Sequence, residues 1–554
     1  MAIDGIHGTE LEAPVASHFD VVVAGAGFAG MHLLHRLRQA NFRVQVYETG
    51  SGVGGTWYWN RYPGARCDVQ SIEYSYSFDP QLEQDWEWSE KFATQPEILR
   101  YANHVADRFD LRSDIRFDTR ITTAEFDERA GHWRIATQSG PNGGEEACPP
   151  VTAQFYVMAS GCLSAAKQPE LAGLTSFAGP TYHTGHWPHQ GVDFTGLRVG
   201  VIGTGSSGIQ SIPVIAQQAA HLTVFQRTPN FSVPARNCAL DPDMVADAKA
   251  RYPQLRDVMR NSRGGQLREM PELSAFDVSE EDRAKRYEEG WEAGNLGGLL
   301  GAYNDLMISK AANDTVAEFI RAKIRELVHD PAVAETLCPY DHPFGTKRPC
   351  LDTGYYATFN RDNVRLVDLR ATPITAITPT GIDLAAESLA FDVLVFATGF
   401  DAMTGAVINV DIRGRKGRRL RDKWAEGPRT YLGLGIEGFP NFFTVTGPGS
   451  PSVLSNMMVS IEQHGEWITD CLVHLRNNGL ERIEATVEAE HGWVQHVNEV
   501  GDTTLYPTAN SWYMGANVPG KPRVFLPYVG GVGTYRTICD EVAADGYRGF
   551  TLST

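Results

Sequence analysis

Residues 19–30 read FDVVVAGAGFAG, and this stretch decides how the chain begins to fold. Residues 19–24, rich in small and β-branched side chains, predict a buried parallel strand. The strand runs directly into three glycines with the spacing of a dinucleotide-binding turn: Gly25, Gly27 and Gly30. In such a turn the first glycine permits the tight bend, the second lets a pyrophosphate approach the backbone, and the third lets helix and strand pack closely. Residues 31–39 are compatible with that helix, whose N-terminus would face the phosphates.

An acidic residue follows the next predicted strand. Residues 43–47 have the pattern of a second strand, which ends at Glu48. An acid at this offset, about twenty residues after the glycine turn, is typical of a group that binds ribose hydroxyls. The first unit is therefore predicted to hold an adenine dinucleotide.

A second glycine turn occurs much later in the chain. Residues 198–202 predict a strand, 209–220 a helix and 222–225 the following strand. The turn between strand and helix contains four candidate dinucleotide-binding residues: Gly203, Gly205, Ser206 and Gly208. Here Arg227 and Thr228 stand where the first unit has its acid. Because an arginine pairs with a 2′-phosphate, which a carboxylate would repel, this site is predicted to prefer NADP to NAD. The alternative is that Arg227 is a solvated surface charge.

Two dinucleotide units in one chain predict an α/β fold with two Rossmann-like domains, which suits FAD receiving hydride from NADPH. Residues 156–161 and 393–399 are apolar strands that end in a small residue and glycine, as expected beside a bound dinucleotide. The predicted FAD-binding domain is discontinuous, residues 1–150 and 398–554, and the NADPH-binding domain covers 151–397. Within the latter, about 234–343 has a helical pattern and is predicted to be an insertion. In it, Ser279 with Asp282 resembles a helix start, and one helical face carries Val316, Phe319, Ile320, Ile324 and Leu327.

Composition excludes several classes of partner. The 554 residues carry a net charge of −18, which disfavours binding to nucleic acid or to an anionic membrane surface. The eight cysteines form neither a C-x-x-C pair nor a cluster typical of a metal site, so we expect reduced thiols and no metal. The first twenty residues lack a signal-peptide pattern, and no apolar run is long enough to cross a bilayer. We expect a cytoplasmic protein, a monomer or weak oligomer.

Two further stretches carry a family resemblance. Residues 177–188, FAGPTYHTGHWP, have the spacing F-x-G-x-x-x-H-x-x-x-W-P through Phe177, Gly179, His183, Trp187 and Pro188. Residues 55–68 have the spacing G-x-W-x-x-x-x-Y-P-G-x-x-x-D, which includes Gly55, Trp57 and Asp68. Both spacings resemble signatures of the Baeyer-Villiger monooxygenases, flavoenzymes that insert an oxygen atom beside a ketone carbonyl.

The resemblance implies FAD, NADPH, O₂ and a ketone that becomes an ester or lactone through a C4a-peroxyflavin. It also implies that Lys347 contacts the NADPH 2′-phosphate, that Arg348 reaches the flavin and that Asp68 orients Arg348. An arginine suits this place because it stays charged and directs two N–H donors at an oxyanion. We therefore expect Arg348 and Asp68 to be the catalytic pair. The alternative is that Lys347 and Arg348 are solvated surface charges.

Three more elements resemble parts of this family. Trp512 is similar to a mobile-loop tryptophan that contacts NADP, although it could be a packed aromatic. The loop Ser452, Val453 and Leu454 resembles the substrate-facing loop of phenylacetone and steroid monooxygenases, whereas residues 348–350 resemble the cyclohexanone type. An aryl, steroid-like or medium to large cyclic ketone is expected. We interpret His183 and Trp187 as hinge residues that couple NADP occupancy to domain position.

Other functions remain open on sequence alone. An N- or S-oxygenating flavin monooxygenase would share both cofactors, but its fingerprint would lack Trp187 and Pro188 and the motif that ends at Asp68. A disulfide reductase would need a redox cysteine pair, which is missing. A non-enzymatic flavoprotein sensor would bind NADPH without forming product.

Overall fold

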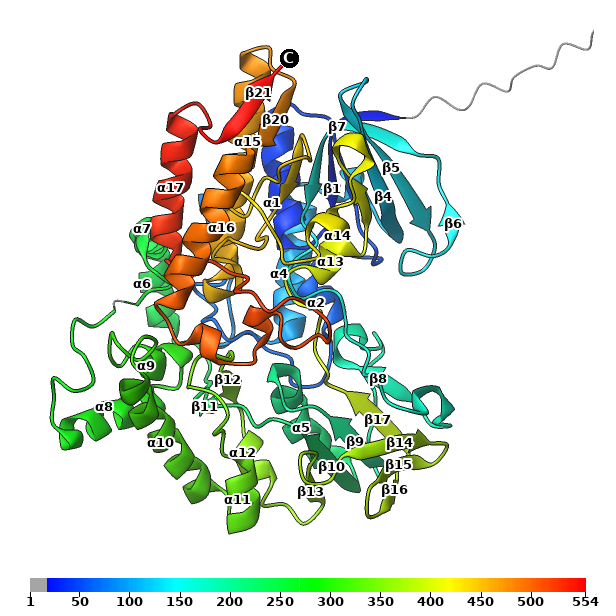
Figure 1. Cartoon of the computed structure of the whole chain (residues 1–554). Helices are drawn as coiled ribbons and strands as arrows, with labels where there is room; N and C mark the ends of the chain where they lie inside the picture. The colour runs from blue at the N-terminus through cyan, green and yellow to red at the C-terminus, as the bar shows by residue number, and fades with distance from the viewer. Residues whose placement is uncertain (1–16, 269) are drawn as a thin grey trace, which may run out of the picture.

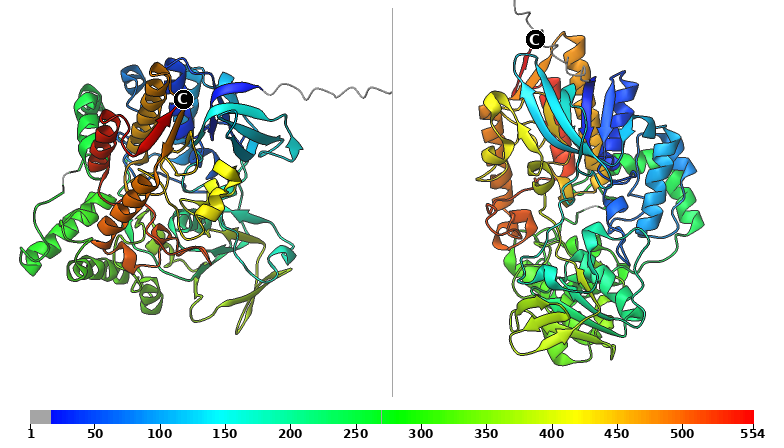
Figure 2. Two further views of the ribbon diagram at one scale, coloured as in Figure 1. Left: turned by 45° about the horizontal axis from the view of Figure 1, so that its top comes forward. Right: turned by 90° about the vertical axis from the view of Figure 1, so that its right-hand side faces the viewer.

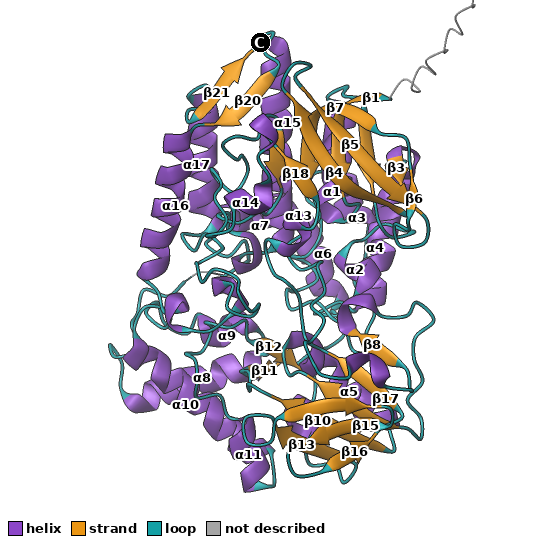
Figure 3. Cartoon of the chain, turned by 45° about the vertical axis from the view of Figure 1, so that its right-hand side comes forward, coloured by secondary structure: helices purple, strands orange, loops and turns teal. Residues whose placement is uncertain are grey.

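The computed structural model describes residues 17–268 and 270–554, which form two stacked α/β bodies (Figures 1 and 3). The upper sheet has the strand order β18-β4-β5-β7-β1-β2-β3, with β19 paired to β7 and β6 to β5. Its strands are β1 (His18–Ala24), β2 (Val44–Tyr47), β3 (Ile115–Arg116), β4 (Thr119–Asp127), β5 (His132–Ser139), β6 (Glu146–Ala147), β7 (Val151–Met158), β18 (Asp411–Arg413) and β19 (Phe442–Thr444). The pairs β7-β1, β1-β2, β2-β3 and β19-β7 are parallel, so their carboxyl ends lie at one edge.

The lower sheet is entirely parallel and has the order β13-β10-β9-β17-β8. Its strands are β8 (Thr181–His183), β9 (Arg198–Ile202), β10 (His221–Gln226), β13 (Val364–Asp368) and β17 (Val393–Phe396). Three small sheets complete the chain: β11 (Ser232–Pro234) with β12 (Cys350–Asp352), β14 (Ile374–Thr378) with β15 (Gly381–Leu384) and β16 (Ser388–Ala390), and β20 (Arg482–Ala485) with β21 (Phe550–Ser553). The two Rossmann-like units predicted from the glycine turns are confirmed.

Helices pack beside the upper sheet (Figure 2). Those of the upper body are α1 (Phe28–Gln39), α2 (Thr56–Trp59), α3 (Pro80–Asp85), α4 (Gln95–Arg108), α13 (Gly405–Ile408), α14 (Leu420–Lys423), α15 (Met457–Asn477), α16 (Val487–Asp502) and α17 (Val532–Ala544). The long helix α15 packs against α1, and their apolar side chains join those of β1 and β2 in one core. This core ties the C-terminal part of the chain to the first dinucleotide unit, as the discontinuous domain requires.

Helices α6 (Pro242–Ala250) and α7 (Tyr252–Asn261) lie beside the upper body, where α7 packs against α17 (Figure 1). The helices of the lower body are α5 (Ser206–Gln218), α8 (Glu280–Ala293), α9 (Leu296–Leu300), α10 (Lys310–Leu327), α11 (Pro331–Leu337) and α12 (Tyr355–Thr358). The predicted insertion is helical from α6 to α11. Ser279 caps α8 as predicted, because its side chain accepts a hydrogen bond from Asp282 N. The predicted apolar face of α10 is buried at Val316, Ile320 and Ile324, but Leu327 is 39% exposed because the helix ends there.

Four boundaries differ from the prediction. Strand β7 hydrogen-bonds to β1, so the domain boundary placed after residue 150 is wrong and falls after about residue 158. We keep the remaining division into domains as a proposal. Helix α1 begins at Phe28, and α5 begins at Ser206, each three residues before its predicted start, because the glycine turn itself forms the first helical turn. Helix α5 also ends earlier, at Gln218.

Candidate active site

The first glycine turn is shaped both by packing and by open space. Gly25 has a φ of 102°, and a Cβ there would lie 2.8 Å from Ala159 O. A Cβ on Gly30 would lie 1.8 Å from Gly25 O, so these two glycines are required by the protein's own packing. A Cβ on Gly27 would meet nothing nearer than Gly55 Cα, at 3.4 Å. Gly27 therefore leaves a bare backbone at the start of α1, as a pyrophosphate requires.

The second turn repeats this division. Gly203 has a φ of 112°, and a Cβ there would lie 2.4 Å from Ala397 O. A Cβ on Gly208 would lie 2.3 Å from Gly203 O, whereas one on Gly205 would meet no atom within 4 Å. Ser206 is the first residue of α5, and its hydroxyl contacts the Cys350 thiol at 3.3 Å. The turn fits a second dinucleotide, with Gly205 as the point of approach.

Glu48 is buried at the end of β2, and both of its oxygens are already hydrogen-bonded. Oε2 accepts a bond from Ala26 N at 2.7 Å, and Oε1 accepts one from Gly50 N at 2.8 Å. Burial raises the pKa of Glu48, while these backbone N–H groups oppose the shift. Because each carboxylate oxygen has two lone pairs, the side chain keeps acceptor capacity for ribose hydroxyls. That role stays a prediction.

Cations gather beyond the end of β10. Burial lowers the pKa of Lys347, Asp341 raises it, and Arg227 and Arg370 lower it further. Arg227 is exposed, and Thr228 O accepts a hydrogen bond from Thr204 at 3.1 Å. The positive charges of this cluster repel one another, and a bound phosphate would stabilise them. The groups predicted to recognise the 2′-phosphate therefore lie together.

The predicted catalytic pair is in direct contact. Arg348 Nε donates to Asp68 Oδ2 at 2.7 Å, and Nη2 donates to Oδ1 at 2.8 Å, which makes the pair bidentate. Nη1 donates to Val453 O at 2.9 Å, so the guanidinium also holds the loop expected to face the substrate. The two charged side chains are 28% and 27% exposed. Burial alone would lower the pKa of Arg348, but Asp68 and Tyr513 hold it well above its ordinary value.

The aromatic residues of the 55–68 signature lie next to the first glycine turn. Gly55 has a φ of 51°, and a Cβ there would lie 2.9 Å from Gly27 Cα. Trp57 is buried on α2, and its indole N–H donates to the Tyr74 hydroxyl at 3.1 Å. Asp68, the predicted catalytic carboxylate, follows on the same segment of the chain.

The fingerprint stretch contains β8 and lies at the crossing between the bodies. His183 Nε2 lies 3.2 Å from both Lys167 O and Thr398 Oγ1, while Nδ1 accepts a bond from Gly185 N at 2.9 Å. Burial and the neighbouring His186 lower the pKa of His183 to about 4. A neutral histidine that joins these two connecting segments is suited to positioning them rather than to proton transfer.

The other fingerprint residues pack rather than face the catalytic pair. Trp187 is buried in the core of the lower body, and Phe177 packs on a smaller core beside the same sheet. A Cβ on Gly179 would lie 2.5 Å from Asp392 O, so this glycine permits a close backbone approach. Pro188 directly follows Trp187 in the connection to β9. The hinge role predicted for this stretch stays a prediction.

Tyr513 is a site residue that sequence reasoning missed. It is 2% exposed and lies beside Arg348, and burial raises its pKa while the guanidinium opposes part of the shift. The neighbouring Trp512 ring lies 4.1 Å from the Tyr513 ring. The signal for it in the sequence is its position directly after Trp512. Ser452 and Val453 are buried, and Leu454 is half-buried, in the loop that contacts Arg348.

Comparison with known proteins agrees with this geometry. Residues 23–85 match the family described as an NAD(P)-binding Rossmann-like domain. A Baeyer-Villiger monooxygenase from Pseudooceanicola batsensis is 43% identical over 544 residues, covering 97% of this chain and 97% of the relative. The chain belongs to the Baeyer-Villiger monooxygenases. An oxidised steroid monooxygenase bound to NADP superposes with a TM-score of 0.91 at 53% identity, covering 97% of this chain and 100% of that one.

The cofactors of this Baeyer-Villiger monooxygenase follow from the same comparisons. A complex of OTEMO with FAD and NADP superposes with a TM-score of 0.92 at 41% identity, covering 97% of this chain and 100% of that one. The predictions of an FAD- and NADPH-dependent monooxygenase with two dinucleotide sites are confirmed. Within the part of the chain that the structure describes, no helix has the length and apolar character needed to span a membrane.

Proposed function

We propose that this Baeyer-Villiger monooxygenase converts aryl, steroid-like or medium to large cyclic ketones to esters or lactones, and that Arg348 is its oxyanion-binding residue. The bidentate contact between Arg348 and Asp68 carries the proposal. When bound, FAD and NADPH supply the electrons that activate O₂. The chain's own residues hold the cofactors, orient the carbonyl and stabilise negative charge.

The hydrogen bonds of Arg348 leave it a free donor. A guanidinium has five N–H groups, of which Asp68 and Val453 O engage three. The Tyr513 hydroxyl is a further partner of the guanidinium, so at least one N–H group remains for an oxyanion that forms on the substrate carbonyl. Asp68 holds the plane of the guanidinium, so little reorganisation is needed when the charge develops. The raised pKa of Arg348 keeps it a hydrogen-bond donor that does not give up its proton.

The cofactor-binding residues are proposed in two groups. Gly25, Gly27, Gly30 and Glu48, with Gly55 and Trp57, would hold FAD. Gly203, Gly205, Ser206 and Gly208, with Arg227, Thr228, Lys347 and Trp512, would hold NADPH. The bare backbone at Gly27 and Gly205 supports both assignments, because neither glycine is demanded by a contact within the protein.

The substrate class rests on the loop Ser452 to Leu454. Ser452 has a φ of 41° and is fully buried, and its hydroxyl donates to Thr446 O at 3.1 Å. A non-glycine residue in this strained conformation is found where a site imposes it. The hydrogen bond from Arg348 to Val453 O links this loop to the proposed oxyanion site. The 53% identity to a steroid monooxygenase supports a bulky ketone.

The proposal is tested with a panel of cyclic, aryl and steroid ketones, run beside sulfides and amines. We expect ester or lactone by gas chromatography, with one NADPH consumed for each product molecule. Sulfoxide or N-oxide without ester would instead support the N- or S-oxygenating alternative. Cofactor binding without product or NADPH consumption would support the sensor. Small open-chain ketones oxidised faster than every cyclic ketone would overturn the proposed substrate class.

We further propose a cytoplasmic enzyme that is a monomer or weak oligomer. All eight cysteines are free thiols, which suits a reducing compartment. Light scattering across a concentration series measures the oligomeric state, and a stable tetramer at micromolar concentration would contradict it.

A further inference from the structure

A cavity of about 360 Å³ lies beside the catalytic carboxylate, and we name it the seam pocket. Asp68 and Glu73 of the upper body form one side. The loop that contains Arg268, helix α8 with Arg286, and the glycine-rich helix α9 form the other. Cavities where two structural units meet are preferred places for small-molecule binding. Because Asp68 is bonded to Arg348, this cavity begins next to the proposed reaction centre.

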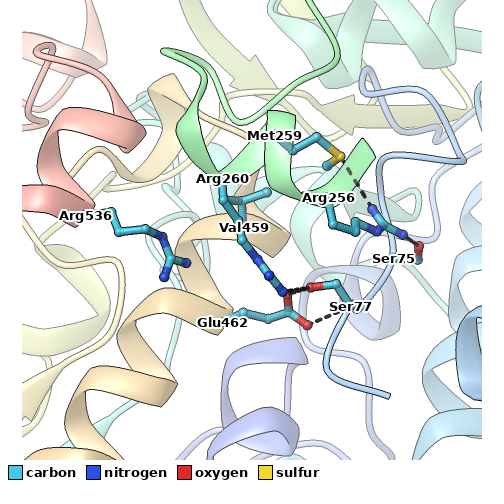
Figure 4. A pocket seen from close by; sticks show the side chains of 8 residues that line it. All are labelled: Ser75, Ser77, Arg256, Met259, Arg260, Val459, Glu462 and Arg536. Atoms are coloured by element: carbon cyan, nitrogen blue, oxygen red, sulfur yellow. Dashed lines mark hydrogen bonds between the residues drawn. The ribbon is translucent and has the colours of Figure 1, made fainter. Parts of the chain in front are cut away.

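The loop with Arg268 follows α7, and α7 is fixed to the upper body. Glu462 on α15 accepts hydrogen bonds from Ser77 N at 2.6 Å and Phe78 N at 3.1 Å, and Arg260 on α7 donates to the Ser77 hydroxyl at 2.9 Å (Figure 4). Helix α7 also packs against α17. These contacts hold the start of the Arg268 loop in place, and with it one wall of the seam pocket.

Arg268 packs against two glycines on its own side of the cavity, one in α9 and one directly after it. A Cβ on Gly297 would lie 3.0 Å from Arg268 Cδ, and one on Gly301 would lie 2.2 Å from Nη2. Any side chain at Gly301 would therefore displace the guanidinium. Glycine at these positions makes room for the charged group inside the cavity.

Among the described residues, the two guanidinium groups that line the seam pocket form no ion pair. Within the described part of the chain, no carboxylate oxygen comes within 4.0 Å of the guanidinium of Arg268 or Arg286. Arg268 donates to the Met270 sulfur at 3.0 Å, a weak acceptor, and Arg286 stacks over the Tyr303 ring at 5.1 Å. Burial and the neighbouring Arg263 lower the pKa of Arg268, and a bound anion would relieve both effects.

The carboxyl groups of the cavity compensate these cations only in part. Asp68 is engaged by Arg348. Burial raises the pKa of Glu73 to about 7, against the opposing effects of Leu267 N and Arg256, so the group carries only part of a charge near neutrality. Glu289 also lines the pocket, on the exposed face of α8. The cavity is therefore polar and suited to an anionic guest.

We propose that the seam pocket binds the carboxylate of a ketone substrate and that Arg268 pairs with it. The inference rests on the proposed function and names its substrate class more narrowly: a cyclic ketone that carries a carboxylate on a side chain. The carbonyl lies at Arg348 while the acidic end reaches past Asp68 to Arg268. Arg286 adds a second positive charge to the same cavity.

The test compares ω-(2-oxocyclohexyl)alkanoates of increasing chain length with their neutral methyl esters. For each pair, kcat/KM of the acid is divided by kcat/KM of the ester, in the wild-type enzyme and in Arg268→Gln. A hydrogen-bonded ion pair supports a drop of at least about tenfold in this ratio at one optimal chain length. Arg268→Lys should restore part of it. Lys285→Gln, which removes an exposed positive charge from α8 outside the cavity, is the matched control and should leave the ratio unchanged.

Failure of the inference is distinguishable from failure of the proposed function. If the wild type oxidises the esters but Arg268→Gln leaves the acid-to-ester ratio intact at every chain length, the carboxylate site is wrong while the ketone activity stands. A rise in the KM for NADPH without a change in this ratio would assign Arg268 to the cofactor and overturn the inference. Calorimetry of the holoenzyme with 3-cyclohexylpropanoate, which has no ketone, tests the site without turnover. Binding that Arg268→Gln abolishes supports it, and equal binding by both proteins refutes it.

Discussion

Replacing Arg348 by alanine separates oxyanion stabilisation from cofactor binding. The change removes the N–H donor left free by Asp68, Val453 O and Tyr513. Loss of one such donor from an oxyanion site costs about 10² to 10³ in kcat. We therefore expect ester formation to fall by at least about 10².

The fold should survive this substitution. Asp68, the partner left behind, is 27% exposed, so water can solvate its carboxylate. Lys347 and Arg227 are untouched, so the affinity for NADPH should change little. The assay measures ester by gas chromatography beside NADPH oxidation and hydrogen peroxide release.

Two companion variants sharpen the result. Asp68→Asn keeps the shape of the partner but removes its charge, and we expect a smaller loss than for Arg348→Ala because the guanidinium remains. Arg348→Lys keeps the charge but cannot form the bidentate contact, so it should resemble the alanine variant more than the wild type. Ester formation by Arg348→Ala within tenfold of the wild-type rate, with normal NADPH affinity, would refute the assignment of Arg348.

Further expectations concern the second turn, the phosphate cluster and the fingerprint histidine. Gly205→Ala should keep the wild-type melting temperature and raise the KM for NADPH at least about tenfold, whereas Gly208→Ala should lower the melting temperature, because its Cβ would lie 2.3 Å from a carbonyl oxygen. Unchanged NADPH kinetics in Gly205→Ala would contradict this. The double variant Lys347→Ala with Arg227→Ala should reduce the preference for NADPH over NADH, measured as the ratio of their kcat/KM values, by about tenfold or more. An unchanged ratio would contradict the role of these cations in binding the 2′-phosphate. Burial lowers the pKa of His183 to about 4, below its unfolded value, so its effect destabilises the fold as pH falls through 6.5 towards 4. Between pH 7 and pH 5 the wild type should lose about 2 kcal/mol more of its free energy of unfolding than His183→Asn does, as measured by urea unfolding. An equal loss in both proteins would contradict a neutral His183.

The glycine turns and the fingerprints could be predicted from sequence because their information is local. A strand, a G-x-G-x-x-G turn and a helix lie within about thirty consecutive residues, and the required φ angles and close backbone approaches follow from the residue types themselves. The two Rossmann-like units, the helical insertion and the Ser279 cap therefore emerged correctly.

The details that failed depend on partners distant in the chain. Strand β7 reads as any apolar strand, and only its pairing with β1 assigns it to the upper sheet. Leu327 continues the apolar period of α10, but the helix ends before that face is covered. Tyr513 lies beside Arg348 only because segments far apart in the chain meet there.

The sequence by itself determined the family, both cofactors and the residues expected to take part in the reaction. Each of these depends on a short motif whose spacing is fixed. The contact between Arg348 and Asp68 could be expected from the resemblance, but its bidentate geometry and the bond to Val453 O exist only after segments far apart in the chain meet. The seam pocket with Arg268 was decided by tertiary structure alone. Its walls come from two bodies, so its lining and its charges are set only when these segments pack together.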